Sequence, residues 1–253
     1  MRIGPGHIGN KTPVKTLVAR WLGRLPYSDG AELQRKLVRE RRQGRIPDTL
    51  VLLEHPPVIT LGSRARSEHV LLSPSELQAR GIEVHEAGRG GDVTYHGPGQ
   101  LVGYPVVALS GPRRDAHRYL RDLEEALILT AADFGVVASR CAGRTGVWAA
   151  GHKLAAIGVR ISSGWITSHG FAMNVTADLS GFGAIVPCGI RDAGVTSLAE
   201  LTGRSPSLEK VAARAGVHLA GVLGLRPAPS PIPGEQLADL DVVAPAPAQE
   251  VAR

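Results

Sequence analysis

Short apolar runs of strand length recur between residues 49 and 175, and they restrict the possible folds more than any other feature. The first of them are TLVLLEH (49–55), VITLG (58–62), IEVHEA (82–87), DVTYH (92–96) and LVGYPVVAL (101–109). The stretch from Gly146 to Val175 adds GVWAA, KLAAIGVRI and ITSHGFAMNV, which we interpret as a three-stranded meander. Short runs bounded by glycine and proline are typical of β-strands. The chain is therefore expected to build a sheet.

Three longer segments have the periodicity of amphipathic helices. Apolar residues recur at helical spacing in 29–43, 115–134 and 208–223. Gly135 is a suitable stop for the second helix, and Ser207 is a suitable N-cap for the third. Because helices alternate with strands, we expect one domain of mixed α and β structure.

Composition divides the chain into this domain and two loose ends. We expect a flexible N-terminal extension in 1–14, a folded domain in 15–226 and a disordered tail rich in Pro and Ala in 227–253. No apolar run reaches the ~18–20 residues of a membrane span. The N-terminus also lacks the apolar region of a secretory signal. These features favour a cytoplasmic protein that does not bind membranes.

The chain is basic, with 29 Lys and Arg against 23 Asp and Glu and a net charge of +6. A basic surface suits acidic partners. The densest basic segment, QRKLVRERRQGR (34–45), is either a solvated helix face or a contact surface. Basic residues do not alternate with exposed aromatic residues in any recognisable module, so we expect no nucleic-acid partner.

Cys141 and Cys188 are the only two cysteines, too few for a disulfide framework. Cys188 stands between Pro187 and Gly189, where backbone N–H groups can point at its sulfur. A thiolate is a good nucleophile, and its formation needs nearby positive charge or hydrogen-bond donors. Cys188 is therefore a candidate nucleophile, with a small buried hydrophobe as the alternative. Cys141, in SRCAGRTG, is a weaker candidate.

Lys153 opens the apolar strand KLAAIGVRI. Beside a thiol, its ammonium would lower the pKa of the thiol by stabilising the anion. A partly desolvated lysine can also transfer protons near neutral pH. The alternative is a lysine that is exposed at the end of a strand.

Two polar segments complete the candidate site. RGGDVTYHGPGQ (89–100) is rich in glycine, so its backbone can approach a ligand closely, although a tight hairpin is the alternative. TSHGFAMNV (167–175) contains His169 and Asn174, which could orient or protonate a carbonyl near a cysteine. A histidine satisfied within the core is the alternative there. The spacings of His and Cys fit no structural zinc site, so we expect no metal.

Four segments together resemble the lipoyl(octanoyl) transferase family: LLEHPPVITLG, RGGDVTYHGPGQLVGYPV, GHKLAAIGVRI with HGFAMNV, and PCGIRDAGVTSL. The resemblance covers roughly residues 49–201, in the order and approximate spacing of the family. It implies an α+β fold with a mixed β-sheet flanked by helices, as in biotin and lipoate protein ligases. It also implies that 15–226 form a catalytic acyltransferase domain that needs no cofactor.

The resemblance also implies a role for each site residue. Cys188 matches the nucleophile that carries the acyl thioester, and Lys153 matches the lysine that lowers its pKa. The implied substrate pocket is lined by Arg89, Gly90, Gly91, Asp92, Val93, Thr94, Tyr95, His96, Ala156, Ile157, Gly158, Gly170, Phe171 and Ala172. Asp92 departs from the pattern, since relatives often carry Gln there.

The implied reaction moves octanoyl (or lipoyl) from octanoyl-acyl carrier protein to a lysine. The implied acceptors are lipoyl domains of 2-oxoacid dehydrogenases and the glycine cleavage H protein. Exchange of a thioester with a thiolate is nearly isoenergetic, so a cysteine can take the acyl group without ATP and two protein substrates can bind in turn. Lys153, once neutral, can remove the proton of the acceptor lysine. The rival hypotheses are an ATP-dependent lipoate ligase, a thioesterase and a non-catalytic module that binds carrier or lipoyl domains.

Overall fold

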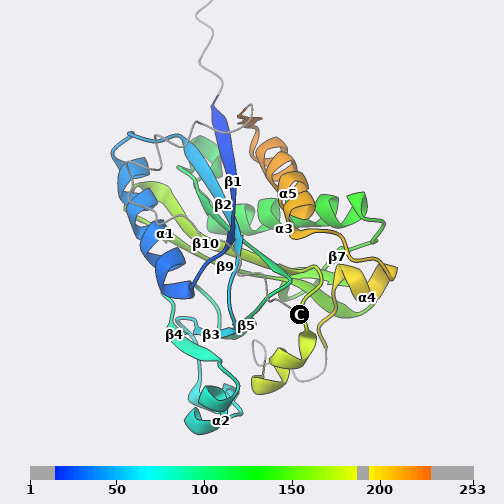
Figure 1. Ribbon diagram of the computed structural model, residues 1–253. Coiled ribbons are helices and arrows are strands. Elements are labelled where there is room, and N and C mark those ends of the chain that lie inside the picture. Colours follow the sequence, from blue (N-terminus) through cyan, green and yellow to red (C-terminus); the bar gives the residue numbers. More distant parts are fainter. Residues whose placement is uncertain (1–14, 187–193, 229–253) are drawn as a thin grey trace, which may run out of the picture.

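Residues 15–186 and 194–228 are described by a computed structural model, in which they form two β-sheets (Figure 1). The larger sheet has the order β11-β1-β2-β6-β10-β9-β8-β7, and the smaller has the order β4-β3-β5. The strands are β1 (Thr16–Arg24), β2 (Asp48–Glu54), β3 (Val58–Leu61), β4 (Glu83–Glu86), β5 (Val93–His96), β6 (Gln100–Val106), β7 (Ser139–Cys141), β8 (Arg144–Ala149), β9 (His152–Ser162), β10 (Ile166–Asn174) and β11 (Arg226–Pro227). Both sheets are mixed, because β1 runs parallel to β2 and β11, and β3 runs parallel to β4, while the other pairs are antiparallel.

Helices cover both faces of the larger sheet (Figure 1). They are α1 (Tyr27–Arg42), α2 (Pro74–Ala79), α3 (Ala116–Asp133), α4 (Leu198–Thr202) and α5 (Leu208–Leu223). On one face, Leu127 of α3 and Leu219 of α5 share a buried cluster with Leu52 of β2. On the other face, Leu33 and Leu37 of α1 are buried in a second cluster. The expected α+β class, a mixed sheet flanked by helices, is confirmed.

The helices and strands that were expected from periodicity are present. α1, α3 and α5 occupy the three predicted helical segments, and Ser207 caps α5 by accepting a hydrogen bond from Lys210 N at 3.4 Å. The predicted meander is β8, β9 and β10. β1 was not expected, because its arginines interrupt the apolar pattern. α2 was also missed, since Leu77 is the only buried residue in its six.

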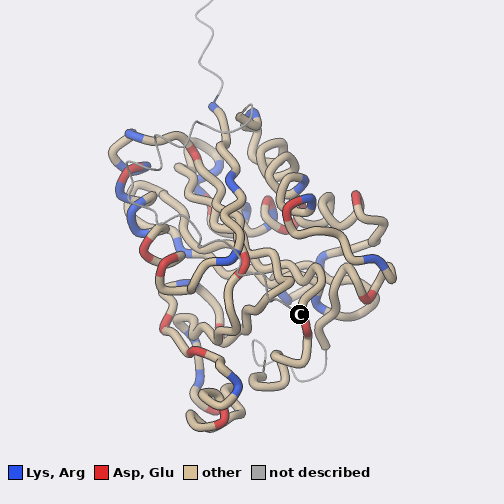
Figure 2. The backbone as a smooth tube through the Cα atoms, in the orientation of Figure 1, with Lys and Arg blue, Asp and Glu red and all other residues tan. Residues whose placement is uncertain are grey.

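Both charge types are distributed along α1, the helix that contains most of the basic segment (Figure 2). Arg41 forms an ion pair with Asp48 at 2.7 Å, and Arg45, just after the helix, pairs with Glu40. Several of these arginines therefore already have acidic partners within the chain. Across 15–186 and 194–228, no helix combines the length and apolarity needed to cross a bilayer.

The smaller sheet carries its own core and contacts β9 through the loop 87–92. Ile59, Leu77, Ile82 and Ile185 form part of this core. The loop 87–92 between β4 and β5 reaches the larger sheet, where Gly90 N donates to Val159 O at 2.9 Å. This backbone hydrogen bond helps to fix the junction of the two sheets, where the site described below lies.

Candidate active site

A narrow cavity of about 50 Å³ lies where the 87–92 loop meets β9 and β10. Its walls come from both sheets and from the start of α1. They consist of Tyr27, Thr60, Arg89, Gly90, Gly91, Thr94, His96, Val102, Tyr104, Ala156, Ile157, Gly158, His169, Gly170, Phe171 and Ala172. Most of the exposed wall is apolar. A linear hydrocarbon chain is the kind of ligand that such a slot favours.

Most of the residues expected in a substrate pocket line this cavity. They are Arg89, Gly90, Gly91, Thr94, His96, Ala156, Ile157, Gly158, Gly170, Phe171 and Ala172. Val93 and Tyr95 do not, because successive side chains of a strand point to opposite faces and these two are buried in the core of the smaller sheet. His169, expected as a supporting residue, also lines the cavity, whereas Asn174 does not.

Tyr27, Thr60, Val102 and Tyr104 line the cavity without having been expected there. Val102 and Tyr104 are two positions apart on β6, so the period of a strand could have grouped them. Tyr27 and Thr60 offer no such signal, because only the packing of distant segments brings them to the cavity.

Glycine makes the wall beside β9 thin. A Cβ added to Gly158 would lie 2.9 Å from Gly90 O and 3.1 Å from Arg89 Cδ. A Cβ added to Gly170 would lie 2.2 Å from Gly103 O. A larger residue at either position would force neighbouring backbone to move, so these glycines let the chain close around the cavity.

Two neutral histidines, His96 and His169, line the cavity, and a third, His55, lies behind Tyr104 of its wall. His55 donates from Nδ1 to Leu25 O at 2.6 Å, which leaves Nε2 to accept from the Tyr104 hydroxyl at 2.7 Å. Burial lowers the pKa of His55 to about 4 and the pKa of His96 to about 3. Burial, with the charge of Arg89 nearby, lowers the pKa of His169 to about 4. These rings are therefore uncharged at neutral pH.

A chain of buried hydrogen bonds connects this histidine cluster to the strand of Lys153. His96 Nδ1 donates to Gln100 Oε1 at 2.7 Å, and Gln100 Nε2 donates to Asn174 Oδ1 at 2.9 Å. Asn174 Nδ2 donates to Thr196 O at 2.9 Å, and Thr196 N donates to Lys153 O at 3.0 Å. Asn174 thus supports the backbone beside Lys153 and has no direct access to the cavity.

A second, wide cavity of about 690 Å³ adjoins the narrow one. It is lined by Arg64, Arg66, His69, Gly90, Gly91, Asp92, Leu120, Gly143, Arg144, Thr145, Lys153, Ala156, Ile157, Gly158 and Val159. The two cavities share Gly90, Gly91, Ala156, Ile157 and Gly158, and these residues form the shared wall. Asp92 lies on the wide side, where its carboxylate accepts a hydrogen bond from His69 Nδ1.

Lys153 lines the wide cavity and is only 8 % exposed. Its Nζ lies 5.0 Å from the centre of the Trp148 ring, a cation–π contact. Within 15–186 and 194–228, no carboxylate forms an ion pair with it. A buried ammonium without a fixed counter-ion is able to stabilise an anion that forms beside it.

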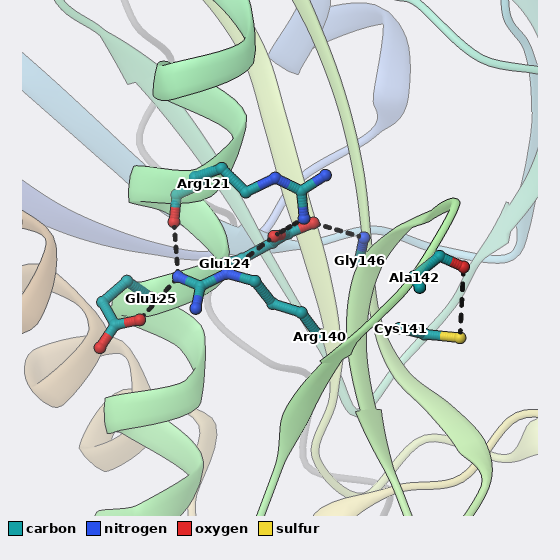
Figure 3. Close-up of polar contacts among 7 residues, drawn as sticks. All are labelled: Arg121, Glu124, Glu125, Arg140, Cys141, Ala142 and Gly146. Atoms are coloured by element: carbon teal, nitrogen blue, oxygen red, sulfur yellow. Dashed lines mark hydrogen bonds and ion pairs between the residues drawn. The ribbon is translucent and has the colours of Figure 1, made fainter.

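Glu124 of α3 supports the strand next to Lys153 (Figure 3). This carboxylate is completely buried, pairs with Arg121 and Arg140, and accepts a hydrogen bond from Gly146 N at 3.1 Å. Gly146 has a φ of +122°, and a Cβ added there would lie 3.6 Å from Lys153 Cε. Glu124 therefore holds a bend of β8 that makes room for Lys153.

Cys188, the expected nucleophile, lies outside the described residues. The described residues on either side of 187–193 are both bonded to residues of the wide cavity. Val186 N donates to His69 O at 2.8 Å, and Lys153 N donates to Gly194 O at 3.0 Å. Cys141 lines neither cavity, and its Sγ donates a weak hydrogen bond to Ala142 O at 3.9 Å (Figure 3).

No metal site is evident in the described ranges, where no three His, Cys, Asp or Glu side chains converge.

Comparison with known proteins gives a family and several close relatives. The lipoyl protein ligase A/B catalytic domain family matches residues 26–220. The chain is 51 % identical over 216 residues to an octanoyltransferase of Chloroflexus aurantiacus, covering 85 % of this chain and 97 % of the relative. It is 54 % identical over 210 residues to an octanoyltransferase of Rubrobacter xylanophilus, covering 83 % and 91 %.

Solved structures share the architecture at much lower identity. Lipoate-protein ligase A bound with ATP gives a TM-score of 0.66 at 16 % identity, covering 90 % of this chain and 94 % of that one. A bi-partite lipoate protein ligase from Thermoplasma acidophilum gives 0.62 at 16 % identity, covering 90 % and 92 %. This likeness confirms the expected lipoate ligase-like fold.

Proposed function

The chain belongs to the lipoyl protein ligase A/B catalytic domain family, and from this premise we propose that it is an acyltransferase that moves an octanoyl group onto lipoyl-accepting proteins. The donor is an octanoyl-acyl carrier protein, and the acyl group passes through a thioester on Cys188. The acceptors are lysines of lipoyl domains of 2-oxoacid dehydrogenases and of the glycine cleavage H protein. The need for a reduced thiol favours a cytoplasmic location.

One observation carries this proposal: a buried lysine, with no ion-pair partner among the described residues, lies in a wide cavity that shares a thin wall with a narrow apolar slot. The slot suits the octanoyl chain. The wide cavity suits the end of the donor's arm or the acceptor lysine. Residues on both sides of the Cys188 segment are bonded to His69 and Lys153, which supports a reaction at this cavity.

The first half of the reaction loads the cysteine. Neutral Lys153 takes the proton of Cys188, and the thiolate attacks the thioester carbonyl of the donor. The bond from the carbonyl carbon to the carrier's sulfur breaks. The departing thiolate then recovers the proton from the Lys153 ammonium, which leaves a free carrier thiol and an acyl-enzyme.

The second half transfers the group to the acceptor. The acceptor amine attacks the acyl-enzyme carbonyl, the bond to the Cys188 sulfur breaks and an amide forms. Neutral Lys153 accepts the proton that the amine loses. The enzyme ends this half with a Cys188 thiolate beside a Lys153 ammonium, so it can begin again without ATP.

Intact-mass spectrometry in the absence of ATP tests the proposal. Incubation with octanoyl-carrier protein should add the mass of one octanoyl group, and addition of a lipoyl domain should remove it. Cys188→Ser should abolish the adduct, and Cys141→Ser is the matched control that should keep it. Lys153→Ala should slow loading by roughly 10²–10⁴-fold, the range of general acid–base catalysis. Full transfer by Cys188→Ser, or transfer only when ATP is present, would reject the proposal in favour of a ligase.

A further inference from the structure

The wide cavity is strongly cationic. Among the described residues that line it, Arg64, Arg66, Arg144 and Lys153 are positive and Asp92 is the single carboxylate. Asp92 already accepts hydrogen bonds from His69 Nδ1 and, at 3.3 Å, from Arg66 N. These contacts hold the Asp92 carboxylate against the 66–69 segment, and Arg66 also forms an exposed ion pair with Glu68 at 3.8 Å. With four cations against one carboxylate in its described lining, the cavity favours an anionic group.

Backbone hydrogen bonds fix the segment that bears Arg64 to the shared wall. Ser63 N donates to Arg89 O at 2.9 Å, and Arg64 N donates to Gly91 O at 3.0 Å. Gly62 permits this close approach, since a Cβ added to it would lie 2.3 Å from Gly91 O. The backbone of Arg64 is thus held beside the shared wall, and its exposed side chain starts from a fixed position next to the narrow slot.

The arginines and Lys153 lie toward opposite ends of the cavity. β9 lines it from Lys153 to Val159, and at 3.3 Å per residue this stretch spans roughly 20 Å. Gly90, beside the arginine segment, is bonded to Val159. An anion at the arginine end would therefore lie well away from the reacting carbonyl, at the other end of an extended group.

We propose that Arg64 and Arg66 bind the phosphate that links the donor's pantetheine arm to its carrier, an inference that rests on the proposed function. The arm of an acyl carrier has its thioester at one end and a phosphodiester at the other. About four peptide-like units separate them, on the order of 14 Å when extended. An arm of this length fits within the roughly 20 Å over which β9 lines the cavity. Guanidinium groups recognise phosphate oxygens through paired, charge-assisted hydrogen bonds.

Three acyl donors distinguish the contribution of the phosphate to the reaction rate from that of the rest of the carrier. Octanoyl-pantetheine has no phosphate, octanoyl-4′-phosphopantetheine adds it, and octanoyl-carrier protein adds the acidic protein surface. In the unaltered enzyme, the phosphate should raise kcat/KM about ten-fold or more, mainly through a lower KM, as expected for charge-assisted hydrogen bonds. In Arg64→Gln/Arg66→Gln, this ratio should fall to about one. Rates with octanoyl-pantetheine should stay within about two-fold.

The matched control is Arg35→Gln/Arg39→Gln, which removes the same charge from exposed positions of α1. It should keep the phosphate ratio of the unaltered enzyme. An unchanged ratio in the Arg64/Arg66 variant, or a ratio near one in the unaltered enzyme, would overturn the inference. A loss confined to the whole carrier protein would also overturn it and assign the arginines to the acidic protein surface. Failure of all three donors would instead reject the proposed function, and the inference with it.

Discussion

The two cavities share a wall, but their chemistry is opposite. Apart from Arg89, which donates to Thr60 O at 2.6 Å, the described lining of the narrow cavity is neutral, and burial keeps His96 uncharged by lowering its pKa to about 3. The wide cavity contains several cations, and its arginines at 64 and 66 are exposed to solvent. Because a charge is costly in the first environment and well solvated in the second, an acyl chain and its charged carrier arm would separate between them. Under the proposed function, specificity for the chain and attraction of the donor would be set by different cavities.

The boundary between the cavities consists largely of backbone. Gly90, Gly91 and Gly158 contribute no side chain to it, and Ala156 contributes only a methyl group. A thin boundary lets the reacting carbonyl lie at the wide side while its chain lies in the narrow one. Any side chain added at this point should disturb both cavities at once.

Gly158→Val should have the largest effect on activity, because it closes the boundary. Its first added carbon would already lie 2.9 Å from Gly90 O, so the loop and the slot must shift. Misplacement of about 1 Å can cost roughly 10²-fold in rate, and we expect at least that loss in kcat/KM with octanoyl-carrier protein. Gly221→Ala is the control, since a Cβ there meets nothing within 4 Å and α5 favours alanine.

The length of the acyl group on the donor provides a second test of Gly158→Val. A short acyl group such as acetyl needs little of the slot, so its slow transfer should be far less affected by Gly158→Val. Equal losses for acetyl and octanoyl donors would show that the substitution disturbs the reaction centre alone, and the separation of the two cavities would lose its support.

The sequence predicted the sheets and the long helices, because apolar periodicity reports directly on burial. It also identified the glycine-rich loop and the strand of Lys153, which contribute most of the shared wall. It could not tell which residues of 92–96 face the cavity, since this depends on strand register. That register sends Thr94 and His96 inward and leaves Asp92 on the wide side.

Residues contributed by distant segments were beyond the reach of sequence patterns. Arg64 and Tyr27 lie in stretches with no motif, and only the contact of the smaller sheet with β9 and α1 brings them to the site. Glu124 belongs to an ordinary amphipathic helix, and its partner Gly146 lies 22 positions away. Such groups are defined by tertiary packing, on which local periodicity carries no information.

Glu124→Gln should have the next largest effect and should act on the wide cavity alone. The amide of glutamine can still accept a hydrogen bond from Gly146 N, but the substitution removes the negative charge that pairs with Arg121 and Arg140. Weakening these buried, charge-assisted bonds should cost about 2 kcal/mol of unfolding free energy, measured by urea denaturation. Glu125→Gln is the control, since that carboxylate is 42 % exposed and bonds to Arg140 at 2.6 Å.

The same variant tests whether Glu124 positions Lys153. If it does, the pH profile of acyl transfer should change in Glu124→Gln, while the KM for short and long acyl donors changes equally. A variant that is less stable but keeps the pH profile of the unaltered enzyme would limit Glu124 to a purely structural role.

The smallest expected effect comes from the neutral histidine His169 on the narrow side. Its pKa is lowered to about 4 in the folded chain, against about 6.5 when unfolded, so the unfolded state binds more protons between these values. Stability from this residue is therefore complete above pH 6.5 and is lost as the pH falls toward 4. Lowering the pH from 7.5 to 5.5 should cost about 1 kcal/mol through His169.

His169→Asn isolates this contribution, because asparagine also tolerates the positive φ of +54° found at this position. Urea unfolding at pH 7.5 and 5.5 should show that the variant loses about 1 kcal/mol less than the unaltered protein over this interval. Equal losses in the two proteins would mean that the His169 ring takes up its proton as readily in the folded chain as in the unfolded one. The narrow cavity would then be open to water and charge, and it would not differ from the wide cavity in excluding them.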